Sequence, residues 1–269
     1  MFDRLSYATV LASVPRLTPE TAPYIYKLES KTVIKVGNRH RISEAAAMRF
    51  VRSKTKIPVP EVYDAYLDQE DPEKALLVME HIEGDVLRDV WDDMCSSQKE
   101  EVVLQLKGFL DELRSIKGDF IGSVDGAACE DPLFDQDPEV IYGPYNTEAA
   151  FNDGIIRTMK STVPGSREPS SQEAFVEMVA DMVRAMPGHD IVLTHGDIAP
   201  RNILVHGSKI VAVLDWELTG FYPEYWEYVK ALYLPDWDQN WIRERAVDKC
   251  MKPYHIEHAV MRQVNDLFW

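Results

Sequence analysis

The sequence is poor in cysteine and has no long apolar run. Its three cysteines, Cys95, Cys129 and Cys250, are widely spaced, and none stands in a Cys-x2-Cys pair or beside a histidine cluster. This pattern argues against a disulfide framework and against a zinc site. No segment approaches the roughly 20 apolar residues of a membrane span, and polar residues interrupt the apolar stretch 7–14. We therefore expect a soluble, cytoplasmic protein without a membrane partner.

Basic residues are also scarce, since 29 Lys and Arg stand against 45 Asp and Glu, which gives a formal net charge of −16. A nucleic-acid surface needs clustered Lys and Arg that face phosphates, so we exclude a nucleic-acid partner. Glycine is absent before Gly37. No glycine-rich phosphate-binding loop therefore opens the chain.

The chain does contain enough apolar residues for a sizeable core, because 45% of its 269 residues are hydrophobic. Residues 96–117 and 172–186 carry apolar side chains at helical spacing, which predicts two amphipathic helices. Between them, residues 118–146 are rich in Gly, Asp and Pro. A long irregular stretch of this kind is uncommon inside a domain unless it has a function.

Two polar segments in the last third of the chain suggest chemistry. Asp197 follows the apolar run 191–193, and Asn202 stands five positions later. Residues 202–205 and 209–214 read as two short strands turned by His206-Gly207-Ser208. Such a hairpin would bring Asp215, which follows the second strand, back beside Asn202.

This set of residues fits phosphoryl transfer, which depends on positioning and charge neutralisation and needs few protein groups. Asp197 is our candidate for the catalytic base that accepts the proton of an acceptor hydroxyl. Mg²⁺ prefers oxygen ligands and retains water, so Asn202 and Asp215 are sufficient protein ligands once the phosphates of ATP complete the site. The predicted cofactors are therefore ATP and Mg.

The pattern His195-Gly196-Asp197-x4-Asn202 with Leu214-Asp215-Trp216-Glu217 resembles the aminoglycoside phosphotransferase and choline kinase-like family, which shares the protein-kinase fold. The run 218–227 resembles the fungal-type branch of that family more than its bacterial resistance enzymes. The resemblance implies an α+β, protein-kinase-like fold with two lobes. Residues 1–83 would form a small N-lobe with an antiparallel sheet, and residues 84–269 a larger, mainly helical C-lobe, together making one compact unit.

The resemblance also implies a lysine on an N-lobe strand, paired with a helical glutamate. Residues 32–36 read as a strand and residues 43–51 as a helix that Ser43 could cap. By resemblance, Lys35 would hold the α- and β-phosphates and Glu44 would hold Lys35. The alternative is an exposed lysine on an edge strand and an ordinary glutamate in a first helical turn.

Two further strands are expected at residues 57–66 and 75–82, on either side of the acidic turn 68–74. In the family, the second strand leads into the hinge, where backbone groups meet the adenine. By resemblance, Glu80 and Ile82 are the candidate positions, although their side chains carry no adenine signal. The alternative is a strand and a loop with a purely structural role, for which we would expect the same sequence.

Because the glycine-rich loop is missing, other segments would have to cover the nucleotide. Residues 7–12 read as a candidate first strand, followed by a Pro- and Thr-rich connection at 14–23. Backbone amides in that connection or at Glu29-Ser30-Lys31 are the groups left to meet phosphate.

A small hydroxylated acceptor is favoured over a protein. Gly196 stands where protein kinases place an arginine, and the path from Asp215 to the aromatic run 222–228 is too short for an activation loop. We assign His195 to bracing the loop by hydrogen bonding and Trp216 to packing, with no chemical role for either.

The acceptor itself is open. Residues 118–146 are a candidate wall of its pocket, and Glu217, Glu224 and Asp236 are equally plausible as acceptor contacts or as surface acids. The acidic surplus would favour a cationic acceptor if it lined the cleft, but we prefer a solvated surface as its explanation. The sequence leaves ATP versus GTP and the oligomeric state undetermined.

Two further functional classes remain. The first is a catalytically weak, pseudokinase-like nucleotide-binding or scaffold protein whose glycine-free N-lobe does not close over ATP. The second is transfer of a nucleotidyl group. Intact Asp197, Asn202 and Asp215 favour the phosphotransferase.

Overall fold

The computed structural model describes residues 4–18, 24–134, 140–162, 171–233 and 239–267. The chain divides into two compact units, the first comprising Met1–Val102 with Pro200–Glu217 and the second Val103–Ala199 with Leu218–Trp269. The lobes expected at residues 1–83 and 84–269 remain a prediction, and residue 83 lies inside the first unit.

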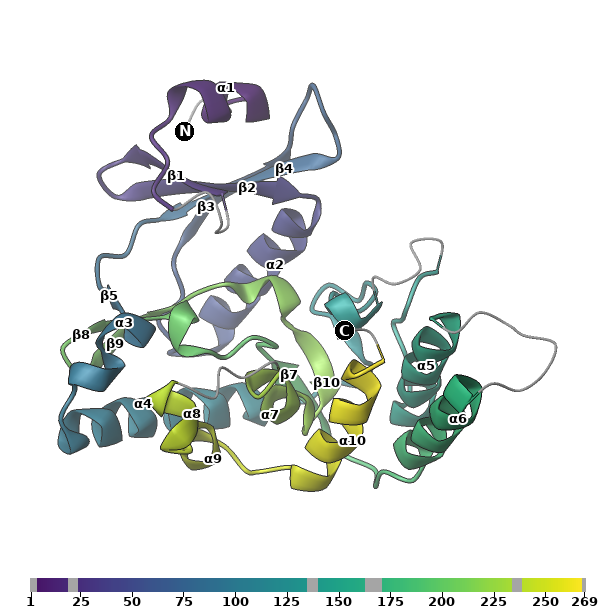
Figure 1. Cartoon of the computed structure of the whole chain (residues 1–269). Helices are drawn as coiled ribbons and strands as arrows, with labels where there is room; N and C mark the ends of the chain where they lie inside the picture. Colours follow the sequence, from purple (N-terminus) through teal and green to yellow (C-terminus); the bar gives the residue numbers. More distant parts are fainter. Residues whose placement is uncertain (1–3, 19–23, 135–139, 163–170, 234–238, 268–269) are drawn as a thin grey trace. The chain divides into compact units, whose positions relative to one another are not determined.

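The first unit contains a small antiparallel sheet in the order β1-β2-β4-β3 (Figure 1). Its strands are β1 (Tyr24–Glu29), β2 (Thr32–Asn38), β3 (Val62–Leu67) and β4 (Lys74–Glu80). The sheet confirms the α+β class and the expected small antiparallel sheet. β3 begins at Val62, five residues later than predicted, since prolines at 58 and 60 cannot donate ladder hydrogen bonds.

The expected first strand at residues 7–12 is wrong, because these residues form helix α1 (Tyr7–Ser13). The Ser6 hydroxyl accepts a hydrogen bond from the Thr9 amide and so caps the helix. Val10 is fully buried in an apolar cluster with sheet residues such as Tyr26 and Ile34, and Tyr7 and Val14 pack against that cluster. Positions 7, 10 and 14 share one face of a helix, and this spacing outweighs the β propensity of Thr and Val.

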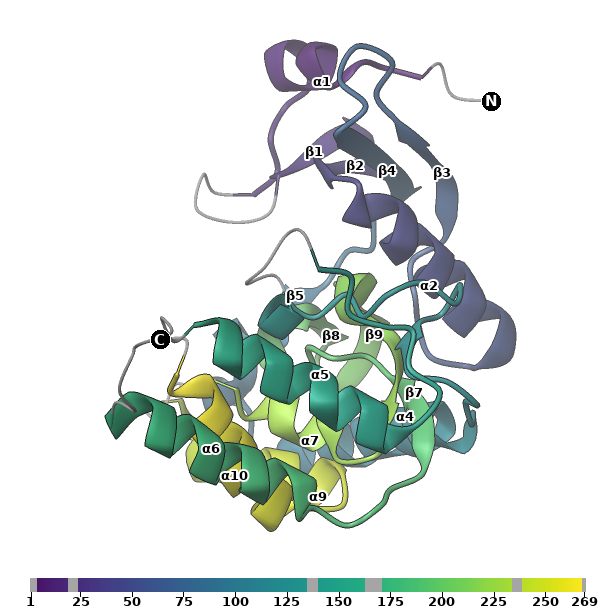
Figure 2. The same cartoon turned by 90° about the vertical axis from the view of Figure 1, so that its right-hand side faces the viewer.

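Helix α2 (His40–Lys54) covers the opposite side of the sheet from α1 (Figures 1 and 2). It begins three residues before the predicted helix, so Ser43 lies inside it and does not cap it. Asn38 accepts a hydrogen bond from the His40 amide at 3.2 Å, which satisfies one free donor of the first turn. The buried face of α2 carries Glu44, Ala45, Ala47, Met48 and Val51.

The predicted hairpin is present in the first unit as β8 (Ile203–His206) and β9 (Lys209–Val213), with β5 (Asp85–Val86) beside β8. Short helical turns flank it at Pro200–Asn202 (η3) and Trp216–Leu218 (η4). The Val213 amide donates to the Pro58 carbonyl at 2.8 Å. This bond attaches the hairpin to the segment that enters β3. The short helical segments α3 (Leu87–Val90) and η1 (Trp91–Asp93) follow β5.

The second unit is mainly helical. Its helices are α4 (Ser96–Ser115, whose first turns belong to the first unit), α5 (Glu148–Ser161), α6 (Ser171–Arg184), α7 (Trp226–Ala231), α8 (Asn240–Arg243), α9 (Ala246–Cys250) and α10 (His255–Asn265). A three-stranded sheet joins β6 (Gly122–Ser123), β10 (Gly220–Pro223) and β7 (Ile191–Thr194). The helices expected at 96–117 and 172–186 are confirmed as α4 and α6.

The stretch 118–146 is irregular as expected, and its described residues include only β6 and the turn η2 (Pro132–Phe134) as regular elements. Near the middle of this stretch, the buried Asp131 carboxylate accepts hydrogen bonds from the Trp226 indole and the Lys230 ammonium on α7. Phe151 of α5 packs edge-on against Trp226 with ring centroids 5.1 Å apart. The hydrogen bonds of Asp131 attach this part of the stretch to α7.

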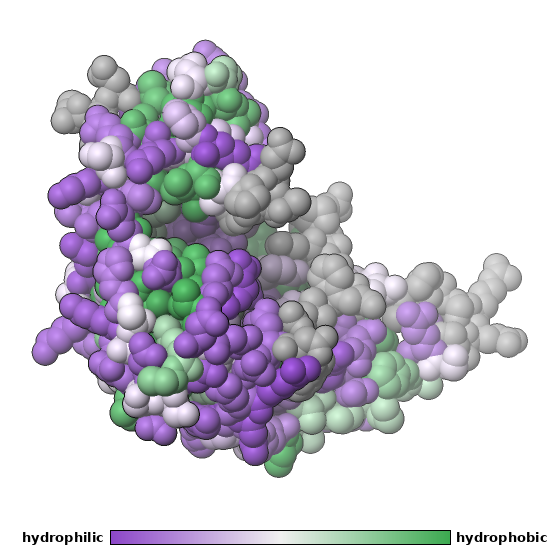
Figure 3. All heavy atoms as spheres, turned by 60° about the vertical axis from the view of Figure 1, so that its left-hand side comes forward, coloured by the Kyte–Doolittle hydropathy of each residue, from purple (hydrophilic) through white to green (hydrophobic). Residues whose placement is uncertain are grey.

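Hydrophilic residues dominate the face shown in Figure 3, with smaller hydrophobic areas between them. None of the helices in the described ranges has the length and apolar character needed to cross a membrane.

Candidate active site

A buried ion pair lies at the centre of the first unit. The Lys35 ammonium contacts Glu44 Oε1 at 2.8 Å and Asp215 Oδ1 at 2.6 Å, and the Lys35 side chain is only 3% exposed. Three segments distant in sequence therefore meet here, namely β2, α2 and the end of the β8–β9 hairpin. The alternative of an exposed lysine on an edge strand does not describe this residue.

The local structure explains why the lysine is buried. β2 lies between β1 and β4, and Lys35 pairs with Ile25 on one side and Leu77 on the other. α2 covers the sheet and presents Glu44 from its buried face. A charge in such a place requires a paired opposite charge, and Glu44 supplies it.

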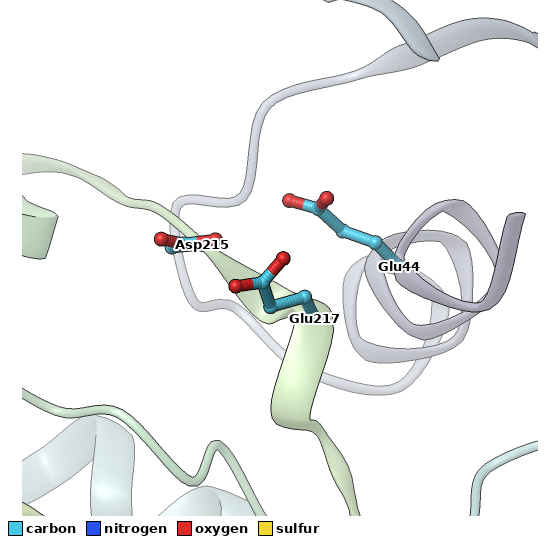
Figure 4. Close-up of side chains that lie close together, drawn as sticks. All are labelled: Glu44, Asp215 and Glu217. Atoms are coloured by element: carbon cyan, nitrogen blue, oxygen red, sulfur yellow. The ribbon is translucent and has the colours of Figure 1, made fainter. Parts of the chain in front are cut away.

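A second cation extends this network. Arg41, one turn before Glu44 on α2, places Nη1 2.5 Å from Glu44 Oε2 and 2.5 Å from Glu217 Oε2. The carboxylates of Glu44, Asp215 and Glu217 offer oxygens that all lie within 4.8 Å of one another, and Figure 4 shows them facing a common space. The result is a continuous chain of charges, Asp215–Lys35–Glu44–Arg41–Glu217.

The surroundings shift the pKa values of these groups. Burial alone would lower the pKa of Lys35, but the carboxylates of Glu44 and Asp215 outweigh it and raise the pKa, so the ammonium stays charged. The pKa of Arg41 is likewise raised, because Glu44 and Glu217 overcome its burial. Burial and the nearby Asp215 charge raise the pKa of Glu217. Each cation is therefore held in its charged form.

Asp215 has an unusual backbone conformation. Its φ of 66° lies in the left-handed region, which is uncommon for residues other than glycine. The neighbours on both sides are fixed: the Leu214 amide donates to the Asn202 carbonyl at 2.8 Å, and the Trp216 indole donates to the Val213 carbonyl at 2.8 Å. Trp216 is fully buried, which confirms it as a packing anchor. The fold thus holds the Asp215 backbone in a strained geometry of the kind found at functional sites.

Asn202 lies in the turn η3 with 7% of its surface exposed. The hydrogen bond between its carbonyl and the Leu214 amide brings the chain at Asn202 beside the chain that leads into Asp215, as the predicted hairpin requires. An amide and a carboxylate, both oxygen donors, therefore stand on adjacent segments. This donor set suits a hard cation such as Mg²⁺.

The two candidate adenine positions are half-buried at and after the end of β4. The Glu80 amide and carboxylate are both used along the strand pair, since the amide donates to the Glu61 carbonyl and the carboxylate accepts from the Glu61 amide. Ile82 follows β4 by two residues. The candidate phosphate-contacting turn Glu29-Ser30-Lys31 lies nearby, because the Lys31 carbonyl accepts a hydrogen bond from His81 at 2.9 Å. Residues 14–23 are the other candidate segment for covering the nucleotide, and positions 19–23 of this segment lie outside the described residues.

The loop with Asp197 belongs to the second unit and is braced from within. His195 is fully buried, and its Nδ1 accepts a hydrogen bond from the Asp197 amide at 3.1 Å. Gly196 has a φ of +84°, and a Cβ atom there would lie 2.9 Å from the Leu218 carbonyl oxygen. Only glycine fits this position without strain. Asp197 itself remains half-buried.

Glu227 on α7 is the main support of this loop. Its carboxylate accepts the His195 amide at 2.6 Å and the Gly196 amide at 3.1 Å. Burial raises the pKa of Glu227, while His195 and the two amides act in the opposite direction. Sequence reasoning gave Glu227 no role, because one acid in an aromatic run gives no signal of burial.

The three acids proposed as acceptor contacts have different environments. Glu217 is occupied by Arg41. The Glu224 carbonyl accepts a hydrogen bond from Arg114 at 2.6 Å, and its carboxylate lies 3.9 Å from the same guanidinium. Asp236 lies outside the described residues. Glu217 and Glu224 therefore both have structural partners.

Comparison with known proteins shows which family the chain belongs to. A sequence model of the phosphotransferase enzyme family (APH) matches residues 16–263, so the chain belongs to this family. It is an aminoglycoside phosphotransferase-like enzyme, a small-molecule kinase with a protein-kinase-like fold. No curated protein matches the sequence significantly.

Solved structures of aminoglycoside phosphotransferases share the fold. The gentamicin complex of APH(2")-IIa has a TM-score of 0.63 at 16% identity, over 100% of this chain and 89% of that one. A thermostable mutant of APH(4)-Ia, in a ternary complex with AMP-PNP and hygromycin B, has a TM-score of 0.62 at 14% identity, over 96% and 84%. The GDP complex of aminoglycoside 2'-phosphotransferase-IIIa has a TM-score of 0.58 at 14% identity, over 95% and 81%. At these identities the likeness concerns the fold.

Proposed function

We propose that this enzyme transfers the γ-phosphate of ATP to a hydroxyl group of a small molecule in a Mg²⁺-dependent reaction. The observation that carries the proposal is the buried contact of Lys35 with both Glu44 and Asp215. A lysine held by a helical glutamate next to a metal-binding aspartate is the arrangement that a kinase-like site needs to hold phosphates.

Each residue has a defined part in this proposal. Lys35 contacts the α- and β-phosphates, Glu44 holds Lys35, and Asn202 and Asp215 bind Mg²⁺. The bound ion would neutralise phosphate charge as it develops in the reaction. Backbone groups at Glu80 and Ile82 meet the adenine.

Asp197 is the proposed catalytic base. It accepts the proton of the acceptor hydroxyl as the oxygen bonds to the γ-phosphorus, and the bond from that phosphorus to the bridging oxygen of ADP breaks. The buried supports His195 and Glu227 fix the backbone of the loop, so Asp197 is oriented before the acceptor binds.

The acceptor class is a small hydroxylated molecule. The solved relatives were captured with gentamicin, hygromycin B or kanamycin, and with GDP, ADP or AMP-PNP. For this chain we propose ATP as the donor, with GTP as the comparison. The net charge of −16 makes an amine-bearing acceptor worth testing beside neutral alcohols.

The test is an acceptor screen with Mg·ATP, in which ADP release above the background ATPase rate is followed by mass analysis of the product. We expect phosphorylated product from the wild type. Asp197→Asn should lower kcat by 10²-fold or more, the usual scale of a general base, while nucleotide binding is retained. A product that carries a nucleotidyl group would replace the proposal, and full turnover by Asp197→Asn would remove this residue from the mechanism.

A catalytically weak scaffold is the second candidate, favoured by the absence of glycine before Gly37. It predicts a folded protein that gives no product with any acceptor. Nucleotide binding without turnover across a broad panel, with ATP and with GTP, would support it.

A further inference from the structure

Arg41 has no part in the reaction as proposed, yet it links two carboxylates of the charged network. Its Nη1 contacts Glu44 and Glu217 together, and its side chain is 13% exposed. An ion pair between a solvent-exposed arginine and one carboxylate contributes little to stability. A buried arginine shared by two carboxylates is a fixed counter-ion.

The surroundings explain why a counter-ion is needed at this place. Glu44, Asp215 and Glu217 carry three negative charges on oxygens within 4.8 Å of one another. Lys35 and Arg41 add two positive charges, so the formal local charge is −3 + 2 = −1. Lys35 contacts Glu44 and Asp215, whereas Arg41 contacts Glu44 and Glu217. Like charges at this spacing repel strongly where water is partly excluded.

The sheet leaves space for this arginine. A Cβ atom at Gly37, near the end of β2, would lie 2.8 Å from Arg41 Nε. That nitrogen is buried and makes no hydrogen bond to any residue that the structure describes. Gly37 has an ordinary backbone conformation, so glycine matters at this position because it has no side chain. The guanidinium passes over β2 at this glycine on its way to the two carboxylates.

We propose that Arg41 is a positioning residue of the nucleotide site. Arg41 neutralises the Glu217 carboxylate, so that the negative charge of Glu217 does not act on Asp215 and Lys35. With Glu217 held by Arg41, the Asp215 carboxylate and the Lys35 ammonium remain available to a metal–nucleotide complex. This inference rests on the proposed function, because it concerns the same site. Arg41 acts through Glu217 and touches no reacting atom.

The first test is a calorimetric titration of full-length protein with Mg·ADP. Arg41→Met makes the formal local charge −2, and we expect the Kd to rise at least tenfold. Adding Glu217→Gln returns the charge to −1, and the double variant should recover binding to within about threefold of wild type. Arg41→Lys, which keeps the charge, should bind more tightly than Arg41→Met. Gly37→Ala should weaken binding by displacing the guanidinium.

An arginine that only stabilises the fold would lower the melting temperature in Arg41→Met but leave the Kd of the folded protein for Mg·ADP unchanged. Wild-type affinity in Arg41→Met, or a double variant as weak as Arg41→Met while circular dichroism shows both folded, would overturn the inference.

A second measurement separates this inference from the proposed function. Melting temperatures of the wild type, Arg41→Met, Glu217→Gln and the double variant, all without ligand, form a double-mutant cycle. We expect Arg41→Met to lower the melting temperature more than the double variant does. If wild type does not bind Mg·ADP but the cycle shows this coupling, the nucleotide function fails and the link between Arg41 and Glu217 stands. Additive effects in the cycle would overturn that link.

Discussion

At the scale of single residues, the site combines groups that the sequence marks clearly with groups that it does not. Lys35 and Asp215 could be predicted as site residues because each is a charge attached to an apolar strand, although an exposed Lys35 on an edge strand was the alternative. Arg41 and Glu227 are not evident. An arginine three residues before a glutamate on a helix looks like a solvent-exposed pair, and only the fold places it between the buried Glu44 and the half-buried Glu217.

Glu227 supports a prediction at this scale. In Glu227→Gln the amide nitrogen cannot accept a hydrogen bond, so either the His195 or the Gly196 amide loses its buried partner. We expect a loss of about 1–3 kcal/mol in the free energy of unfolding. Because the loop carries Asp197, kcat should fall while the Kd for Mg·ADP stays near that of wild type.

Chemical denaturation and steady-state kinetics measure these two effects. Glu177→Gln is the matched control, because that side chain is 59% exposed and pairs only at the surface with Lys160. The control should change stability by less than about 0.5 kcal/mol. An unchanged kcat in Glu227→Gln would mean that the loop keeps its geometry without this carboxylate.

At the scale of elements, periodicity predicted α4 and α6, gave no prediction for α5, which is as long as α6, and failed on the short α1. α4 and α6 each present three or more turns of apolar spacing, which is enough to define a face. α1 has seven residues, and Thr and Val made it read as a strand. Its true face appears only when Tyr7, Val10 and Val14 are placed against the sheet. The start of α2 was also missed, because Ser43 reads as a cap in the sequence, whereas the Asn38 side chain accepts the hydrogen bond from the His40 amide in the first turn.

α1 therefore yields a stability prediction. Val10 is fully buried against the sheet, so Val10→Ala should lower the free energy of unfolding by about 2 kcal/mol, from two lost methyl groups and the cavity they leave. Leu11→Ala on the same helix is the control, since Leu11 is 44% exposed, and its effect should stay below about 0.5 kcal/mol. Equal losses in the two variants, measured by urea denaturation, would show that α1 does not dock through Val10.

At the scale of the whole molecule, the class was predictable and the substrate was not. The spacing of Asp197, Asn202 and Asp215 indicated a kinase-like phosphotransferase, and the family match over residues 16–263 agrees. The acceptor depends on the shape of irregular segments such as 118–146, whose conformation comes from tertiary contacts like those of Asp131 and has no periodic signal. Net charge does not resolve it either, because screening beyond roughly 8 Å at physiological salt removes the influence of distant charges.

The central claim is a Mg²⁺-dependent nucleotide site built on Asp215. Its most direct test is the thermal midpoint of the wild type and of Asp215→Ala with AMP-PNP, in the presence of Mg²⁺ or of EDTA. At a 100-fold excess over Kd, a bound ligand stabilises by about 2.7 kcal/mol, which for a chain of this size is on the order of 5 to 10 °C. We predict this shift for the wild type with Mg²⁺, and its loss both with EDTA and in Asp215→Ala. A folded wild type that shows no shift, or a variant that shifts as much as the wild type, would contradict the account.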